Sequence, residues 1–107
     1  MSFADSAEAG SIRLESDHIL FAKCKDMSGN WVSSSMDLDR HIGNVNGNLT
    51  WDSGAYSVSS KDIHLDVSGF PGRVVLSAKL KKEDGSYKDS SINLNDRIMN
   101  KNGHLEY

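Results

Sequence analysis

The chain has almost none of the features by which secreted, membrane-spanning and metal-binding proteins are often recognised. Its 107 residues include one cysteine, Cys24, and one proline, Pro71. A lone cysteine excludes a disulfide within the chain and a zinc site built from several cysteines. No apolar run approaches the roughly 20 residues of a membrane-spanning helix, and residues 1–6 lack the basic and apolar stretches of a signal peptide. We therefore expect a cytoplasmic protein with no membrane partner, since a free thiol suits a reducing compartment.

Charge and aromatic content are also low. Twelve basic residues face 15 acidic ones, for a formal net charge of −3, and the two signs are scattered along the chain. Binding to a phosphate backbone needs a concentrated basic face, so we expect no nucleic-acid partner. Hydrophobic residues make up 37% and aromatics 7%. A chain of this length is one domain's worth and buries only about two-thirds of its unfolded surface. Residues 1–107 should therefore form a single domain, neither half of which folds easily alone.

Signatures of catalysis are missing as well. The four histidines, His18, His41, His64 and His104, do not have the spacing that gathers a metal, and we predict no metal or cofactor. Cys24 stands at an apolar strand position, where a thiol usually behaves as a small buried hydrophobe. There is no Gly-rich phosphate loop and no nucleophile motif. A glycosidase-like pair of carboxylates could be imagined, but its separation is not readable from sequence. These absences favour a protein that is not an enzyme.

What the sequence does contain is an internal repeat. A shift of 56 residues lays 19–51 over 75–107, and thirteen of the 33 aligned positions are identical. The earlier parts match with a different shift, because the second copy has extra residues around 68–72. Two copies, roughly 1–51 and 52–107, predict a pseudo-two-fold module, since a solenoid needs at least three repeats.

Each copy has the pattern of β-strands joined by tight turns. Leu20, Ala22 and Cys24 alternate with polar or outward residues, which predicts a half-buried antiparallel strand. Asn46-Gly47 and Asn102-Gly103 are hairpin signals, and segments 37–42 and 93–98 each support one capped helical turn. The fold class is therefore all-β. Its expected core consists of matched residues: Leu20, Ala22, Leu38, Ile42 and Leu49, with Leu76, Ala78, Leu94, Ile98 and Leu105.

Segments 33–39 and 42–51, with their second copies 90–95 and 98–105, resemble the signature of the cyanovirin-N homology family. Phe3 with Ser6, and Tyr56 with Ser59, stand where that family opens each repeat. The resemblance covers nearly the whole chain and occurs twice in the same order. It implies one all-β domain of two pseudo-symmetric repeats. Each half would be a triple-stranded sheet plus a β-hairpin, with strands exchanged between the repeats and short helical turns.

One departure from the family concerns its disulfides. The better-known members have one in each half, and the corresponding positions here are Ala7 with Cys24 and Ser60 with Leu80. The chain therefore resembles the disulfide-free type of filamentous fungi. Packing must replace the 2–4 kcal/mol that a disulfide typically contributes.

The family resemblance also implies a function. Members are lectins that bind mannose-rich glycans, often α(1→2)-linked mannose, at one or two shallow sites at opposite ends of a monomer, without a cofactor. Carried over residue by residue, the first carbohydrate-binding site consists of Asp5, Ser6, Lys25, Met27, Asn100, Lys101 and Asn102. The second consists of Asn44, Asn46, Ser59, Lys81, Lys82 and Glu83.

Departures at both sites keep a second function open. Lys25 and Met27 do not resemble the acidic and hydroxyl groups that members use, and Gly43 and Val58 lack polar side chains. The alternative is a non-catalytic protein-interaction or structural module whose sugar sites have decayed. Because the opening segment offers the carboxylate Asp5 where the second repeat has valine, we expect the first end to bind mannose at least as well as the second.

Several polar and aromatic residues have a structural interpretation beside the functional one. The asparagines of the two Asn-x-Asn-Gly turns are either turn residues or sugar ligands, because Asn before Gly is common in tight turns. Ser34-Ser35 and Ser90-Ser91 are expected to form local hydrogen bonds at strand ends. The four recurring aromatics are expected to pack in the core rather than stack on sugar: Trp31, Trp51, Tyr87 and Tyr107.

Overall fold

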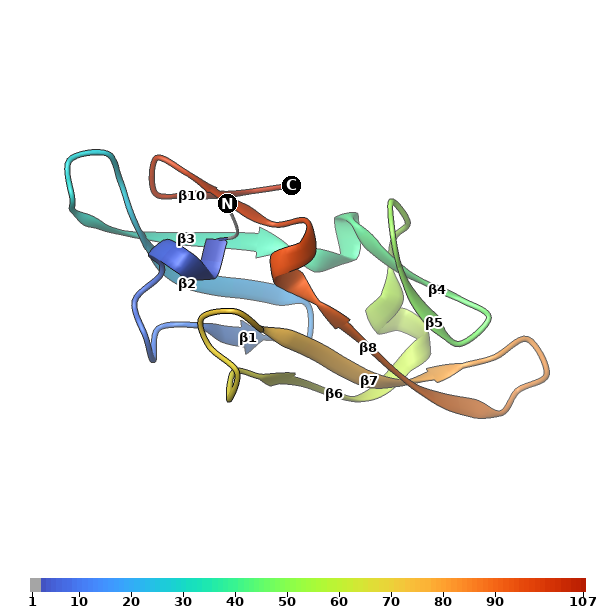
Figure 1. The fold of residues 1–107 in the computed structure, drawn as a ribbon. Coiled ribbons are helices and arrows are strands. Elements are labelled where there is room, and N and C mark those ends of the chain that lie inside the picture. Colours follow the sequence, from blue (N-terminus) through green and yellow to red (C-terminus); the bar gives the residue numbers. More distant parts are fainter. Residues whose placement is uncertain (1–2) are drawn as a thin grey trace.

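The computed structural model describes residues 3–107, and within that range the chain forms short β-strands linked by turns and single 3-10 turns (Figure 1). The first repeat contains η1 (Phe3–Ser6), β1 (Arg13–Glu15), β2 (Ile19–Lys25), β3 (Trp31–Asp37), η2 (Leu38–Arg40), β4 (Ile42–Val45) and β5 (Asn48–Trp51). The second contains η3 (Tyr56–Ser59), β6 (Ser60–Asp66), β7 (Val75–Lys81), β8 (Tyr87–Asn93), η4 (Leu94–Asp96), β9 (Met99–Lys101) and β10 (His104–Glu106). The predicted all-β class is confirmed. No helix of the described range is long and apolar enough to cross a membrane.

Each repeat supplies one antiparallel three-stranded sheet and one hairpin. The sheets are β1-β2-β3 and β6-β7-β8, and the hairpins are β4-β5 and β9-β10. Each hairpin packs on the sheet of the other repeat: β10 lies against β3, and β5 against β8. The predicted exchange of strands is therefore confirmed, and each half needs the other to cover its sheet.

Two serine hydroxyls join the exchanged parts. The Leu105 backbone N–H donates to Ser34 Oγ at 3.0 Å, and the Leu49 N–H donates to Ser90 Oγ at 3.0 Å. The expectation of local hydrogen bonds was wrong for these two serines, because each lies where the hairpin of the other repeat meets its strand. Ser34 and Ser90 therefore have a structural role, which is to hold the hairpin of one repeat on the sheet of the other.

The core runs through both halves. All ten apolar residues predicted to be buried are buried, together with Phe3 and Tyr56 from the opening turns. Cys24 is fully buried, and this burial raises the pKa of its thiol. Ala7 pairs with Cys24, and Ser60 with Leu80, so the positions matched to the family's disulfides are indeed neighbours. Packing of small and apolar side chains takes the place of the covalent links there.

Glycine is required at the exchanged hairpins. Asn102 and Gly103 have φ of 52° and 90°, and Asn46 and Gly47 have 48° and 89°. Positive φ at both central residues is the type I′ geometry of tight hairpins. A Cβ at Gly103 would also lie 2.8 Å from the Cβ of Val32, on the sheet that the hairpin covers. The Asn-Gly pairs therefore serve both the turn and the close approach of the two repeats.

Two of the recurring aromatics are not in the core. Trp31 is 44% exposed and Tyr87 is 46% exposed, so the expectation that they pack inside was wrong. Trp31 pairs directly with Lys25 across β2 and β3, and Tyr87 pairs with Lys81 across β7 and β8. Directly opposed residues share a face, and the lysine side of each sheet faces solvent.

The other two aromatics form a stack that joins the repeats. The Tyr107 ring stacks on His41 with ring centroids 4.2 Å apart and lies 5.7 Å from the Trp51 ring. The Arg97 guanidinium lies 4.8 Å from the Tyr107 ring centroid and donates to Asp52 at 3.3 Å. The Tyr107 hydroxyl also donates to Asp52. This hydrogen bond, aided by Arg97, lowers the pKa of the Asp52 carboxyl.

Candidate functional sites at the two ends

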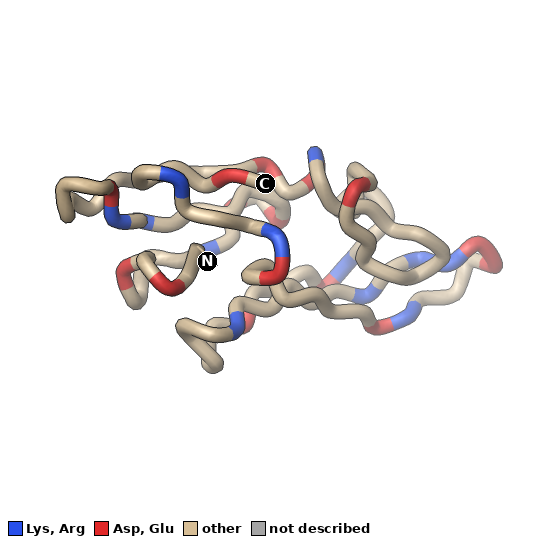
Figure 2. Tube along the Cα trace, turned by 45° about the horizontal axis from the view of Figure 1, so that its top comes forward, with Lys and Arg blue, Asp and Glu red and all other residues tan. Residues whose placement is uncertain are grey.

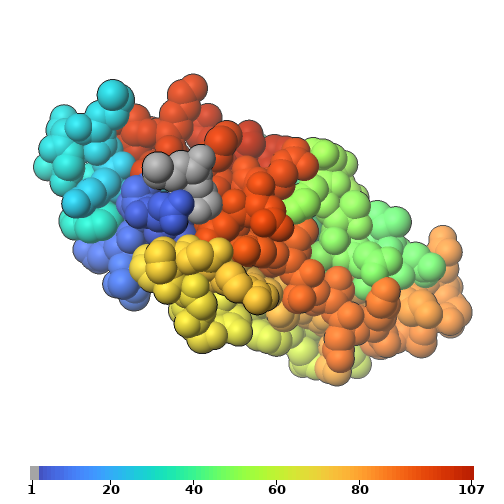
Figure 3. All heavy atoms as spheres, in the orientation of Figure 1, coloured from blue at the N-terminus to red at the C-terminus, as the bar shows by residue number. Residues whose placement is uncertain are grey.

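The two predicted sites lie at opposite ends of an elongated molecule that measures 50 × 24 × 22 Å. One end combines η1, the β2–β3 turn and the β9–β10 turn (Figure 3), and the other combines η3, the β7–β8 turn and the β4–β5 turn (Figure 1). Acidic and basic residues both occur along the whole length (Figure 2). The geometry of the two ends follows the internal repeat.

At the first end, two asparagines clamp the last hairpin onto the rest of the domain. The Asn100 Nδ2 group donates to Ser6 Oγ at 2.7 Å and to the Lys25 backbone oxygen at 2.9 Å. The Asn102 Oδ1 accepts from the Met27 N–H at 2.9 Å. Five of the seven predicted first-site residues are thus joined by these hydrogen bonds.

The second end repeats this arrangement. The Asn44 Nδ2 group donates to Ser59 Oγ at 3.0 Å and to the Lys81 backbone oxygen at 2.8 Å. The Asn46 Oδ1 accepts from the Glu83 N–H at 3.1 Å. The structure brings these predicted second-site residues together in the same way.

The asparagines therefore have a structural role, which was one of the two interpretations open at the sequence level. Asn44 and Asn100 use both hydrogens of their amide NH2 groups on the protein, and their Oδ1 atoms accept from the N–H of Gly47 and Gly103. Asn46 and Asn102 are exposed and use only Oδ1. Within residues 3–107, no hydrogen bond employs their NH2 groups, which leaves two donors at each turn for a ligand.

The second end is hollowed. A surface hollow of about 440 Å³ is lined by Val45 and by all six residues predicted for the second site: Asn44, Asn46, Ser59, Lys81, Lys82 and Glu83. Amide, hydroxyl, ammonium and carboxylate groups thus meet in one shallow depression. Such a set both donates and accepts hydrogen bonds.

Comparison with known proteins identifies the family of this chain. Residues 3–106 match the family model of the CVNH domain. The chain belongs to the CVNH family. It is 40% identical over 108 residues to the Cyanovirin-N homolog of Tuber borchii, an alignment that covers 100% of this chain and 99% of the relative.

Solved structures of the same family share the fold. The CVNH protein of Gibberella zeae superposes with a TM-score of 0.89 at 38% identity, covering 98% of this chain and 95% of that one. Microvirin, solved as a complex with mannobiose, superposes with a TM-score of 0.85 at 27% identity, covering 98% and 96%.

Gly43 has a packing reason in this CVNH chain. A Cβ at Gly43 would lie 2.1 Å from Ser53 Oγ and 2.7 Å from the Gly54 backbone nitrogen. Segment 53–55 crosses directly over β4, where Gly43 pairs with Ala55. No side chain fits at this position. Gly43 therefore lacks a polar side chain because the connection between the repeats packs against it.

Sequence reasoning missed the exposed aromatic beside each site. The Lys25 Nζ lies 5.2 Å from the Trp31 ring centroid, and the Lys61 Nζ lies 4.0 Å from that of Tyr87. The signal that could have revealed them is strand register: opposite an outward-facing lysine, an aromatic also faces outward. Each end of this CVNH domain thus has an aromatic surface next to its polar turn.

A further hollow lies elsewhere, on the outer face of β6-β7-β8. It measures about 460 Å³, and its lining includes His64 and Ser77. At the matching place on the first sheet, Phe21 stands in the position of Ser77, and the Arg13 guanidinium lies 3.9 Å from its ring. The hollow therefore reflects the absence of a large side chain at this position of the second sheet.

Proposed function

We propose that this CVNH protein is a carbohydrate-binding lectin, without enzymatic activity, that recognises mannose-type oligosaccharides with α(1→2) linkages at its two ends. The observation that carries the proposal is the second-end hollow, whose lining consists of the six predicted site residues and Val45. The complex of the related Microvirin with mannobiose supports the choice of sugar.

The chemistry of the hollow suits a pyranose. Sugar hydroxyls donate and accept, so the Glu83 carboxylate accepts from two neighbouring hydroxyls while the NH2 group of Asn46 donates to a third. The Lys81 and Lys82 ammonium groups supply further donors. A charge-assisted hydrogen bond contributes about 1.5–3 kcal/mol and a neutral one about 1 kcal/mol. After the cost of association, a few such bonds give only millimolar to submillimolar affinity for a disaccharide.

Two weak sites on one rigid body suit multivalent glycans. The ends lie along the 50 Å axis of the molecule, so each can engage a different branch or a different glycan chain. Tight binding to a surface that presents many glycans then arises from effective concentration rather than from either site alone. We propose that the protein does this as a monomer, in a reducing compartment such as the cytoplasm.

A protein-interaction role is the second candidate, and the first end favours it. Met27 is 91% exposed in the β2–β3 turn, and Trp31, at the start of β3, is also exposed. Exposed apolar side chains of this kind suit contact with another protein better than contact with a polar sugar. In that case the second end alone, or neither end, would bind carbohydrate.

An NMR titration tests the two candidates together. Amide signals of the full-length protein are followed as α(1→2)-mannobiose is added, with maltose as a matched control disaccharide. We expect mannobiose-dependent shifts at residues 44–46 and 81–83, at residues 5–6 and 100–102, or at both groups. Shifts with both sugars would remove the proposed specificity, and no shifts at millimolar mannobiose would leave the interaction module as the better proposal.

A further inference from the structure

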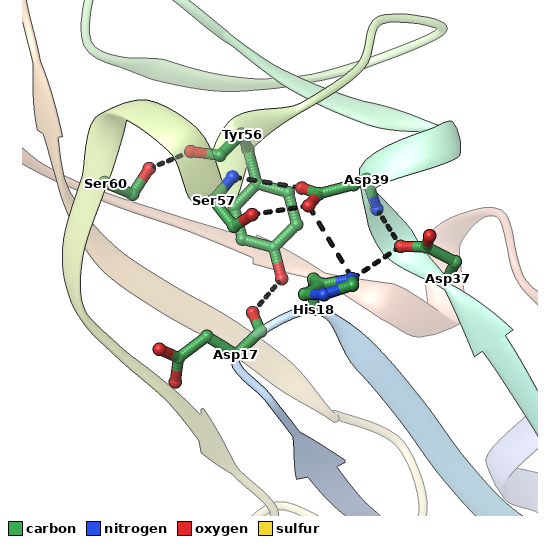
Figure 4. A network of polar contacts seen from close by, with 7 residues as sticks. All are labelled: Asp17, His18, Asp37, Asp39, Tyr56, Ser57 and Ser60. Atoms are coloured by element: carbon green, nitrogen blue, oxygen red, sulfur yellow. Dashed lines mark hydrogen bonds and ion pairs between the residues drawn. The ribbon is translucent and has the colours of Figure 1, made fainter.

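Three potential metal ligands, His18, Asp37 and Asp39, meet where the first repeat joins the second (Figure 4). His18 comes from the β1–β2 turn, Asp37 ends β3, and Asp39 lies in η2. The His18 Nδ1 lies 2.8 Å from Asp37 Oδ1 and 3.6 Å from Asp39 Oδ2. One ligand atom from each residue lies within 4.8 Å of the other two.

The second repeat shows which residue types the fold itself needs at these positions. The backbone N–H of Leu38 donates to the His18 oxygen at 2.7 Å, and that of Leu94 donates to the Val74 oxygen at 2.8 Å, so His18 and Val74 are equivalent. Asn93 is equivalent to Asp37, and its Oδ1 accepts from the Asn95 N–H at 3.1 Å.

The capping hydrogen bond of Asn93 has a counterpart in the first repeat, where the Asp39 N–H donates to Asp37 Oδ1 at 3.0 Å. The next pair also matches. Asp39 Oδ1 accepts from the Ser57 N–H at 3.0 Å, and Asn95 Oδ1 accepts from the Ala4 N–H at 3.3 Å. In the second repeat, a valine and two neutral amides are therefore sufficient to cap the helical turn and to hold the opening segment. The imidazole and the two carboxylates of the first repeat are not required for these backbone contacts.

We propose that His18, Asp37 and Asp39 form a binding site for a divalent first-row transition-metal ion of the zinc class. An imidazole nitrogen with two carboxylates suits Zn²⁺ and its neighbours in the series, whereas Ca²⁺ and Mg²⁺ prefer oxygen ligands alone. This site is independent of the proposed lectin function.

The geometry fits such an ion. Ligand atoms 2.0–2.1 Å from a tetrahedral metal lie about 3.3 Å from one another, and the observed 2.8 and 3.6 Å separations bracket that value. The metal takes the place of the proton that now joins the His18 Nδ1 to Asp37, and all three ligand atoms already lie within 4.8 Å of one another. The side chains are 31%, 36% and 19% exposed for His18, Asp37 and Asp39, which lets water complete the coordination.

The groups around the site orient one ligand and set the local charge. Ser57 donates to Asp39 through both its backbone N–H and its hydroxyl, which fixes the carboxylate in place as outer-shell partners do in metal sites. Asp17 adds a further negative charge near His18, and Arg40 near Asp37 opposes it. With a neutral imidazole, the carboxylates outnumber the cations, which favours a bound cation.

The test is a titration of the metal-free, full-length protein with ZnCl2, followed by calorimetry and by NMR of the histidine ring nitrogens. We expect one zinc ion per chain, with the large shift at His18. The other three histidines should be much less affected. A shift centred on His41, His64 or His104, or the absence of binding at millimolar ZnCl2, would overturn the proposal.

Variants that replace the three proposed ligands with the residue types found at the equivalent positions of the second repeat make the test specific. His18→Val, and the double variant Asp37→Asn with Asp39→Asn, should weaken zinc binding by more than about tenfold while amide spectra report an intact fold. His64→Ala, which removes an exposed histidine elsewhere, is the matched control and should bind zinc as the original chain does. If His18→Val fails to fold, the double asparagine variant decides alone. Zinc binding unchanged by the double variant would also overturn the proposal.

Discussion

Asn100 in the last hairpin donates a 2.7 Å hydrogen bond to Ser6 in the first turn, 94 residues away in sequence. Asn44 and Ser59 form the equivalent bond at the other end, at 3.0 Å. Each bond holds an exchanged hairpin to the opening segment of the repeat that it covers. The polar turns that the family resemblance identifies as sugar sites are therefore also the points at which the two repeats are fastened together.

Asn100→Ala should destabilise the domain by about 1–3 kcal/mol, because it leaves the Lys25 carbonyl and the Gly103 N–H without their partner. Asn102→Gly should cost less, since glycine keeps the positive φ of this turn and only the single bond to the Met27 N–H is lost. Urea unfolding of the two variants measures the difference. Equal losses would mean that the NH2 group of Asn100 does not fasten the hairpin.

Asp5→Ala and Asn102→Ala should each weaken binding of α(1→2)-mannobiose at least as much as Asn46→Ala does. The reason is that Asp5 supplies a charge-assisted acceptor where the second repeat has Val58. Asn44→Ala is excluded from this comparison, because it breaks structural bonds. Residue-resolved titrations measure the two ends separately. Loss confined to Asn46→Ala would assign sugar binding to the second end.

Gly103→Ala should destabilise the domain more than Gly29→Ala does. Both glycines have positive φ, 90° and 85°, so alanine costs roughly 1–2 kcal/mol at either position. At Gly103 the new methyl group would also clash with Val32, whereas at Gly29 no heavy atom lies within 4 Å. Thermal or urea unfolding of the pair measures this. Equal destabilisation by the two variants would show that the β9-β10 hairpin moves away from β3 without a loss in the free energy of unfolding.

The Tyr107–Asp52 contact should make stability depend on acid pH. Accepting the phenol hydrogen bond lowers the pKa of the Asp52 carboxyl, so the folded state favours the ionised form. Its contribution is therefore present above the unfolded pKa near 3.8 and is lost as pH falls through the lower, folded value.

Tyr107→Phe should bring the folded-state pKa of Asp52 closer to its unfolded value. The variant should therefore be less stable than the original chain by a larger amount at pH 6 than at pH 2.5. Urea midpoints across that range test it, with the exposed Tyr87→Phe as the control. A deficit that does not change with pH would attribute the role of Tyr107 to ring packing on His41 alone.

Cys24 should be inert in the folded protein. It is fully buried, and burial raises the pKa of its thiol, so the thiolate that reacts with disulfide reagents is scarce. A thiol reagent should modify native protein at the rate of unfolding, and a reducing agent should leave the thermal midpoint unchanged. A midpoint that falls on reduction would reveal an oxidised species, such as a covalent dimer, that contributes to stability.

Local pattern determined much of this structure. The alternation around Leu20 and Leu76 placed the buried faces of two strands correctly, because period two is a property of the extended backbone itself. Asn-Gly placed the tight turns, because positive φ is a demand of the turn and not of its surroundings. Because these signals occur twice in the same order, the sequence alone is enough to identify the fold.

Other features depended on contacts between segments far apart in the chain. The exposure of Trp31 follows from its pairing with Lys25, and the long-range bond of Ser34 follows from hairpin exchange; neither is visible in local pattern. His18, Asp37 and Asp39 show no metal-ligand spacing along the chain. They meet because β2 pairs with β3 from Ile19 opposite Asp37, which brings the β1–β2 turn beside η2. Sequence determines what each segment does alone, whereas which side chains converge is decided by strand register and by the exchange that each half needs to bury its core.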